Sequence, residues 1–134
     1  MRFSQAFNFE EFEIAPGKYV GGKQPCFIIA EIGQNHQGDI EVAKQLIQSA
    51  VDCGVDCVKF QKSELESRFT NEVLRRPYSG KNSWGDTYGE HRSYLEFSKT
   101  QFRELKVFAE QLGVIFTASA MDKVLCTFYL IDKL

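Results

Sequence analysis

Three short apolar runs, separated by helical patterns, constrain most strongly what this chain can fold into. The runs cover 27–33, 55–61 and 114–119. One helix is predicted after Asp39, a favourable N-cap, and before Gly54. A second helix is predicted after the capping-box pair Ser98 and Gln101 and before Gly113. Strands that alternate with helices predict an α/β fold whose parallel sheet is built from right-handed crossovers.

Two further segments flank these strands and helices. The stretches 12–14 and 18–20 surround Ala15-Pro16-Gly17, a turn signal, and therefore predict a β-hairpin. Residues 1–11 are expected to form a loose tail. The segment 62–97 is far longer than the roughly 2 to 6 residues usual for loops in α/β units. It is rich in aromatic and hydrogen-bonding side chains, which favours a functional loop over a disordered insertion.

Composition excludes several classes of partner. The 16 basic and 18 acidic residues give a net charge of -2, so no long-range field steers the chain to nucleic acid or to anionic lipid. No apolar run approaches the ~20 residues of a membrane span, and the N-terminus has no signal-peptide core. We therefore expect a cytoplasmic protein. Its four cysteines show no Cys-x-x-Cys spacing, which predicts reduced, buried, structural thiols and no zinc site.

Polar residues near the carboxyl ends of the apolar runs are candidates for chemistry. Side chains alternate along a strand, so Glu31, Lys59, Gln61 and Ser119 are predicted to face one side of the sheet. Ile28, Val58 and Phe116 would then face the helices. A lysine suits phosphate or carboxylate binding, and a nearby carboxylate suits proton transfer. The alternative is that Glu31 and Lys59 only form an internal salt bridge.

The loop after the first run, 33–39, is dense in amide and imidazole groups. His36 is a candidate ligand or proton carrier, and the alternative is a hydrogen-bonding scaffold. The glycines match neither a Walker nor a dinucleotide-binding pattern. Since the other histidine, His91, lies in the long segment, no local two-histidine metal motif exists.

Three motifs in order resemble the sialic acid synthase family, and its animal members in particular. They are Glu31-Ile32-Gly33-Gln34-Asn35-His36-Gln37-Gly38, Val58-Lys59-Phe60-Gln61-Lys62 and Ser83-Trp84-Gly85-Asp86-Thr87-Tyr88-Gly89-Glu90-His91. The resemblance implies a transferase that condenses phosphoenolpyruvate with N-acetylmannosamine or its 6-phosphate and releases phosphate. It also implies a TIM (β/α)8 barrel with an N-terminal hairpin, a divalent metal (Mg or Mn) and a homodimer completed by an antifreeze-like domain.

The resemblance also implies roles for single residues. Glu31 matches the catalytic glutamate, and Lys59, with Gln61 beside it, matches the lysine that binds phosphoenolpyruvate. Ser119 matches a hydroxyl residue that contacts the same substrate. Asn35 and His36 match motif residues at the barrel mouth, assigned here to substrate binding. The Trp84–His91 segment resembles the animal enzymes, which implies a phosphorylated sugar as acceptor.

The likeness ends after Asp122, and a (β/α)8 barrel takes about 250 residues. Residues 12–134 are therefore expected to be the N-terminal part of an incomplete barrel domain, with the hairpin and the first three βα units. The metal ligands are expected to lie outside this chain, which we expect to be inactive alone. The alternatives are a non-catalytic product that associates with full-length subunits and a free-standing α/β binding module.

Overall fold

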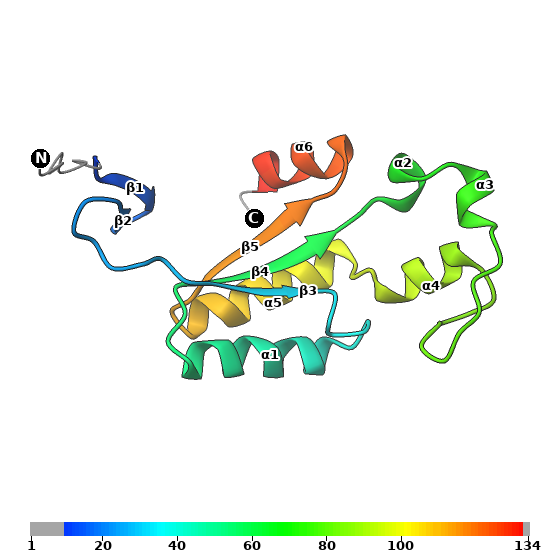
Figure 1. Cartoon of the computed structure of the whole chain (residues 1–134), viewed down its shortest axis with the longest axis horizontal. Helices are drawn as coiled ribbons and strands as arrows, with labels where there is room; N and C mark the ends of the chain where they lie inside the picture. The colour runs from blue at the N-terminus through cyan, green and yellow to red at the C-terminus, as the bar shows by residue number, and fades with distance from the viewer. Residues whose placement is uncertain (1–9, 133–134) are drawn as a thin grey trace, which may run out of the picture.

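The computed structural model of the chain describes residues 10–132, with five strands and six helices in that range (Figure 1). The strands are β1 (Phe12–Ala15), β2 (Lys18–Val20), β3 (Ile29–Gly33), β4 (Cys57–Lys62) and β5 (Ile115–Ala120). The helices are α1 (Ile40–Asp52), α2 (Leu65–Arg68), α3 (Asn71–Leu74), α4 (Tyr88–Leu95), α5 (Lys99–Gln111) and α6 (Lys123–Asp132). Most of the expected N-terminal tail, residues 1–9, lies outside the described residues.

The central sheet is parallel, with strand order β3-β4-β5, which confirms the predicted α/β class. β1 and β2 form the predicted antiparallel hairpin. Figure 1 shows α1 and α5 side by side beneath the sheet, joined by the ion pair of Lys44 with Glu104 at 2.8 Å. This arrangement leaves the other side of β3 and β4 without a covering helix within residues 10–132.

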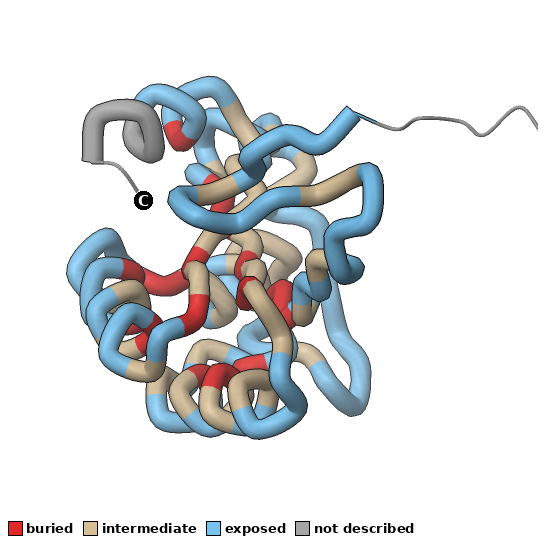
Figure 2. The backbone as a smooth tube through the Cα atoms, turned by 90° about the vertical axis from the view of Figure 1, so that its left-hand side faces the viewer, coloured by how far each residue is buried: buried red, intermediate tan, exposed pale blue. Residues whose placement is uncertain are grey.

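The core lies between the sheet and these two helices. It is centred on stacked and edge-on rings of Phe60, Phe102 and Phe116, with Val58 fully buried. Figure 2 shows the buried backbone positions concentrated on the strands and on the inner sides of the helices. The prediction for Ile28 was wrong: this residue precedes the first residue of β3, is 50% exposed and is not part of the core that packs on the helices.

Both long helices begin and end where the sequence predicts. Asp39 caps α1 by accepting hydrogen bonds from the N–H groups of Glu41 and Val42. Ser98 and Gln101 form a reciprocal capping box at the start of α5. These local contacts satisfy backbone donors that no helical carbonyl reaches.

The segment 62–97 is not a plain loop, because it contains α2, α3 and α4. Two of these helices have at most four residues, too short to show a helical period in the sequence. α4 begins with a capping box in which Thr87 and Glu90 bond reciprocally. The backbone N–H of Asp86, followed by that of Thr87, donates to the Glu90 carboxylate and holds its pKa below the usual value. We call residues 62–97 the insertion from here on.

The four cysteines are all free, as predicted, but only Cys57 is buried. Cys26, Cys53 and Cys126 are exposed, so the prediction of buried structural thiols was wrong for these three. Cys26 lies before β3 and Cys53 follows the last residue of α1, and neither position belongs to a face that packs on the core. Burial raises the pKa of the Cys57 thiol, which keeps it protonated and unreactive.

The chain continues as a helix after Asp122, the point at which the sequence analysis expected the likeness to the family to end. Asp122 accepts hydrogen bonds from the N–H groups of Glu64 and Leu125, and Leu125 is buried. α6 therefore provides the helix expected after the third strand. None of the helices within residues 10–132 combines the length and apolar character that crossing a bilayer requires.

Candidate active site

Glu31 and Lys59 face each other across neighbouring strands. They are register partners of β3 and β4, and Glu31 Oε2 lies 2.7 Å from Lys59 Nζ. The two side chains are 49% and 34% exposed, so the pair lies at the surface rather than inside a core. The predicted salt bridge is therefore present, and its exposure leaves both charged groups open to a ligand.

Gln61 and Ser119 extend the same row of polar side chains. They are register partners of β4 and β5. Since Val58 and Phe60 belong to the core beneath the sheet, alternation places Lys59 and Gln61 on the opposite face. The structure thus brings Glu31, Lys59, Gln61 and Ser119 together, and we call these four residues the polar row.

Gly33 marks the point where β3 turns away from the row. The β3–β4 register shifts between Glu31 and Gly33, and Gly33 has φ +58°, a conformation that favours glycine. A Cβ atom there would lie 3.6 Å from Gln61 Nε2 and 3.9 Å from Glu31 Oε1. The side chains of Glu31 and Gln61 therefore converge over this glycine.

The two loop candidates lie in different surroundings. Asn35 is exposed and lines a surface cavity. His36 is only 1% exposed, with its ring stacked on Phe97 at 4.0 Å between centroids. Its Nδ1 accepts a hydrogen bond from the backbone N–H of Gly38 at 3.1 Å. These contacts match the alternative in which His36 is a hydrogen-bonding scaffold.

Burial lowers the pKa of His36 from 6.5 to about 4. The folded state therefore binds fewer protons than the unfolded state between these two values, and stability falls as the pH drops through that window. We expect the unfolding free energy of this chain to decrease by up to about 1.4 kcal/mol per pH unit there. Urea unfolding at pH 7, 5.5 and 4.5 measures it. His36→Gln keeps an acceptor for the N–H of Gly38 but does not titrate, so its unfolding free energy should lack this decrease. Equal slopes of unfolding free energy against pH in the two proteins would contradict the contribution of His36.

A buried carboxylate that the sequence analysis missed holds the insertion against the sheet. The Glu96 side chain is 8% exposed and accepts hydrogen bonds from Lys62 Nζ at 3.2 Å and the Ser63 N–H at 3.0 Å. It also accepts from Gln34 Nε2 at 2.8 Å and Arg92 at 3.4 Å. Only the i,i+4 spacing of Arg92 and Glu96 was a sequence signal for this cluster.

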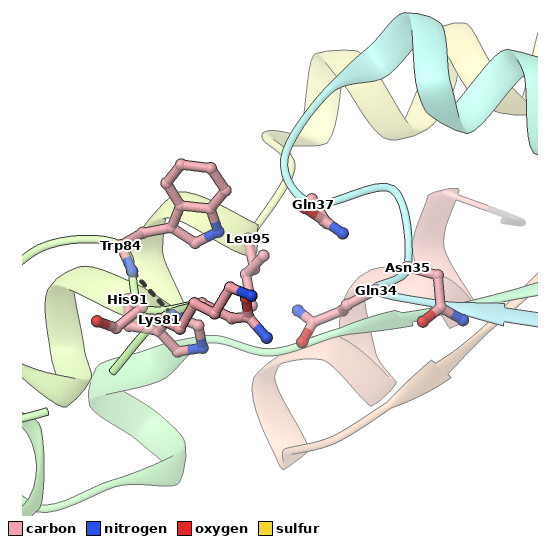
Figure 3. A pocket seen from close by; sticks show the side chains of 9 residues that line it. Gln34, Asn35, Gln37, Lys81, Trp84, His91 and Leu95 are labelled. Atoms are coloured by element: carbon pink, nitrogen blue, oxygen red, sulfur yellow. Dashed lines mark hydrogen bonds between the residues drawn. The ribbon is translucent and has the colours of Figure 1, made fainter. Parts of the chain in front are cut away.

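A cavity of about 430 Å³ lies between the loop after β3 and the insertion (Figure 3). Gln34, Asn35 and Gln37 form one wall. The opposite wall comes from Lys81, Asn82, Ser83, Trp84, His91 and Leu95. The Trp84 ring stacks on Tyr94 at 4.3 Å. Because Gln34 and Asn35 follow Gly33 directly, the cavity adjoins the polar row without including its residues.

The described residues do not make a metal site by themselves. Within residues 10–132 there is no group of three or more His, Cys, Asp or Glu side chains that could hold an ion. Glu31 is the only carboxylate of the polar row, and it is paired with Lys59. We therefore derive no chemical step through a metal from these residues.

Comparisons with known proteins identify relatives of this chain. The NeuB family model matches residues 46–130, past the point where the likeness was expected to end. N-acetylneuraminate-9-phosphate synthases of Mus musculus and Homo sapiens are each 60% identical to this chain over 118 residues, or 88% of it. The crystal structure of N-acetylneuraminic acid (sialic acid) synthetase from Leptospira borgpetersenii, in complex with citrate, superposes with a TM-score of 0.65 at 30% identity and covers 85% of this chain.

These relatives are longer proteins. The chain spans 33% of the length of the mouse and human synthases and 35% of the Leptospira structure. The spore coat polysaccharide biosynthesis protein spsE from Bacillus subtilis has a TM-score of 0.64 at 26% identity, and the match covers 92% of this chain and 31% of that protein. The family model matches more than half of the chain, and the matches to the mouse and human synthases at 60% identity cover 88% of it: the chain belongs to the NeuB family.

Proposed function

We propose that this chain is the N-terminal part of a sialic acid synthase. The reaction condenses phosphoenolpyruvate with N-acetylmannosamine or its 6-phosphate and gives N-acetylneuraminate or its 9-phosphate and inorganic phosphate. The observation that carries the proposal is the polar row, in which a lysine, a carboxylate, an amide and a hydroxyl share one face at the carboxyl ends of parallel strands. Ligands of parallel α/β sheets bind at these ends.

The row suits the charges of this reaction. Lys59 supplies a point charge for the phosphate or carboxylate of phosphoenolpyruvate, and Gln61 and Ser119 supply hydrogen bonds that orient it. The enol carbon of phosphoenolpyruvate forms a bond to the aldehyde carbon of the sugar, and water adds to the adjacent carbon, which carries the phosphate ester. The bond between that carbon and the ester oxygen then breaks, and inorganic phosphate leaves with this oxygen. Glu31 is the group that exchanges a proton with the acceptor or the water.

The open sheet supports a larger assembly around this row. β3 and β5 are the outer strands of the sheet within residues 10–132, and parallel sheets are normally covered on both faces. We propose that β3, β4 and β5 with their helices are the first three units of a (β/α)8 barrel whose remaining strands cover these edges. The divalent metal and the homodimer that the resemblance implies belong to the same proposal, as does the cytoplasmic location expected from the composition.

A second candidate follows from exposed apolar side chains near the hairpin. Phe12, Tyr19, Ile28 and Ile29 are between 45% and 59% exposed. Such a surface favours association. A non-catalytic role, in which the chain associates with full-length synthase subunits, predicts that the two copurify in a fixed ratio. If this chain sediments only as a monomer in the presence of the full-length synthase, that result argues against the role.

A chimaera tests the proposed activity. The 118 matched residues of this chain replace the corresponding segment of the mouse synthase, and phosphate release from phosphoenolpyruvate is measured with each sugar acceptor. We expect a rate within roughly tenfold of the mouse parent, since a displaced catalytic group costs about 100-fold. The 134-residue chain alone should release no phosphate. A chimaera with native circular dichroism but no turnover would falsify the proposal.

A further inference from the structure

Glu96 bonds to the ends of both strands that carry the charged pair of the polar row. The residue directly follows α4. One carboxylate oxygen, Oε1, accepts from Gln34 Nε2 at 2.8 Å, in the loop that follows β3. The other oxygen, Oε2, accepts from the Ser63 N–H at 3.0 Å and from Lys62 Nζ at 3.2 Å, at the end of β4. A single carboxylate therefore joins the two strand ends, and we call these three contacts the Glu96 bridge.

The bridge lies where backbone pairing of the sheet becomes irregular. The register between β4 and β5 is continuous along the whole of β4, so Gln61 and Ser119 stay opposite each other. The register between β3 and β4 shifts directly after Glu31. Backbone pairing thus sets the β4–β5 part of the polar row, whereas the separation of Glu31 from Gln61 depends also on what holds the chain after β3.

Burial leaves the bridge little freedom to move. The Glu96 side chain is 8% exposed and that of Lys62 is 10% exposed. Arg92 adds a bond to Oε1 at 3.4 Å. Ser63 is buried, and its hydroxyl accepts from Arg68 Nη1 at 2.7 Å. Hydrogen bonds to a charged acceptor that water hardly reaches are strong, so the carboxylate fixes the distance between the two strand ends.

We propose that Glu96 is a positioning residue for the condensation reaction. It acts through Gln34 and the end of β4, and it holds Glu31 at a fixed separation from the lysine and the amide of the polar row. Its oxygens bond to residues next to the row rather than to the row itself. The inference rests on the proposed function, because it takes the polar row as the reacting site. A displacement of about 1 Å costs roughly 100-fold in rate, so loss of the bridge should lower kcat.

An apolar replacement of the buried ion pair separates positioning from stability. In the chimaera, the double variant Lys62→Met, Glu96→Met removes the bridge and fills the same space, a change that is often neutral for folding. We expect native circular dichroism, a kcat lowered by roughly tenfold to 100-fold and a KM for phosphoenolpyruvate within about twofold of the chimaera. Lys62→Met alone keeps the Gln34 and Ser63 contacts of the bridge, so its kcat should fall less than that of the double variant.

The conservative variant Glu96→Gln should show the opposite combination. Lys62 Nζ and the Ser63 N–H can only donate, so the carbonyl oxygen of the introduced amide stays with them. The amide nitrogen then faces Gln34, whose own amide can turn over and accept. Both strand ends stay joined, and we expect kcat within roughly threefold of the chimaera, less than the effect of one hydrogen bond, although stability is lost. Glu72→Gln, in an 85% exposed ion pair of the insertion, is the control that should change neither quantity.

Steady-state phosphate release, measured where circular dichroism shows each variant to be folded, decides between positioning and a merely structural role. Two results would overturn the proposal. One is a double variant with the kcat of the chimaera. The other is a folded Glu96→Gln variant whose kcat is as low as that of the double variant. If Glu96→Gln does not fold, the comparison of the double variant with Lys62→Met and Glu72→Gln still decides.

Backbone order parameters give a second measurement, which needs no activity. In the 134-residue chain, amide nitrogen relaxation reports the motion of the Gly33 and Ser63 N–H groups. Both order parameters should fall in the double variant, from about 0.85 toward 0.6, and stay unchanged in Glu72→Gln. Unchanged order parameters in the double variant would contradict the bridge. An inactive chimaera contradicts the proposed function, and the order parameters then decide whether Glu96 fixes the strand ends.

Discussion

Replacing Lys59 with alanine in the chimaera is expected to lower kcat/KM for phosphoenolpyruvate by roughly 100-fold to 1,000-fold, the effect of removing one preorganised charge or donor from a transition state. Lys59 is the cation of the polar row, 2.7 Å from Glu31. The fold should persist, because Glu31 is 49% exposed and its carboxylate remains hydrated when the lysine is lost. Exposed pairs contribute only about 0 to 1 kcal/mol.

The control for this prediction is another lysine in a surface ion pair. Lys18 lies 3.0 Å from Asp56 and is 50% exposed, but it belongs to the hairpin, away from the polar row. Lys18→Ala should leave kcat/KM unchanged while costing a comparable amount of stability. Steady-state phosphate release and thermal unfolding, measured on both variants, separate the two effects. Near-normal kinetics in the Lys59 variant would remove this lysine from the site.

Replacing Glu96 with glutamine is expected to destabilise the 134-residue chain by about 3 to 5 kcal/mol, the usual cost of breaking a buried ion pair from one side. The substitution leaves Lys62 and Arg92, 10% and 16% exposed, without a counter-charge. Arg92 Nε is already buried without a hydrogen-bond partner among the described residues, so the cluster has no spare acceptor. A loss of this size is a large fraction of the stability of a small domain.

Urea unfolding followed by circular dichroism and by Trp84 fluorescence tests this prediction. Glu72→Gln is the matched control, because Glu72 pairs with Arg76 at 3.7 Å but is 85% exposed. The control should change the unfolding free energy by less than about 1 kcal/mol. Similar midpoints for the two variants would show that Glu96 does not hold the insertion in place.

The sequence predicted features that depend on neighbours along the chain. The caps Asp39 and Ser98 contact backbone groups two or three residues away, so the starts of α1 and α5 could be predicted from the sequence. The pairing of Glu31 with Lys59 followed from strand alternation in a parallel sheet. The resemblance added roles to these positions, and the structure brings them together without testing those roles.

What the sequence could not predict depends on contacts between distant residues. Glu96 bonds to Lys62 and Gln34, which precede it by 34 and 62 positions. No local pattern marks such a cluster, and the sequence analysis placed Glu96 only within the long segment 62–97. The burial of His36 likewise depends on Phe97, the last residue of the insertion, whose ring stacks on the imidazole in the loop after β3.

The Glu96 cluster also bears on how such enzymes could be re-engineered. Gln34 from the β3 loop and Lys62 from the end of β4 are both bonded to one carboxylate of the insertion. Gly38 approaches the backbone of Tyr94 so closely that a Cβ atom there would collide with it. The insertion therefore cannot be exchanged between relatives without the loop that it contacts. A graft that alters acceptor preference between relatives has to transfer the β3 loop, Lys62 and residues up to 97 as one unit.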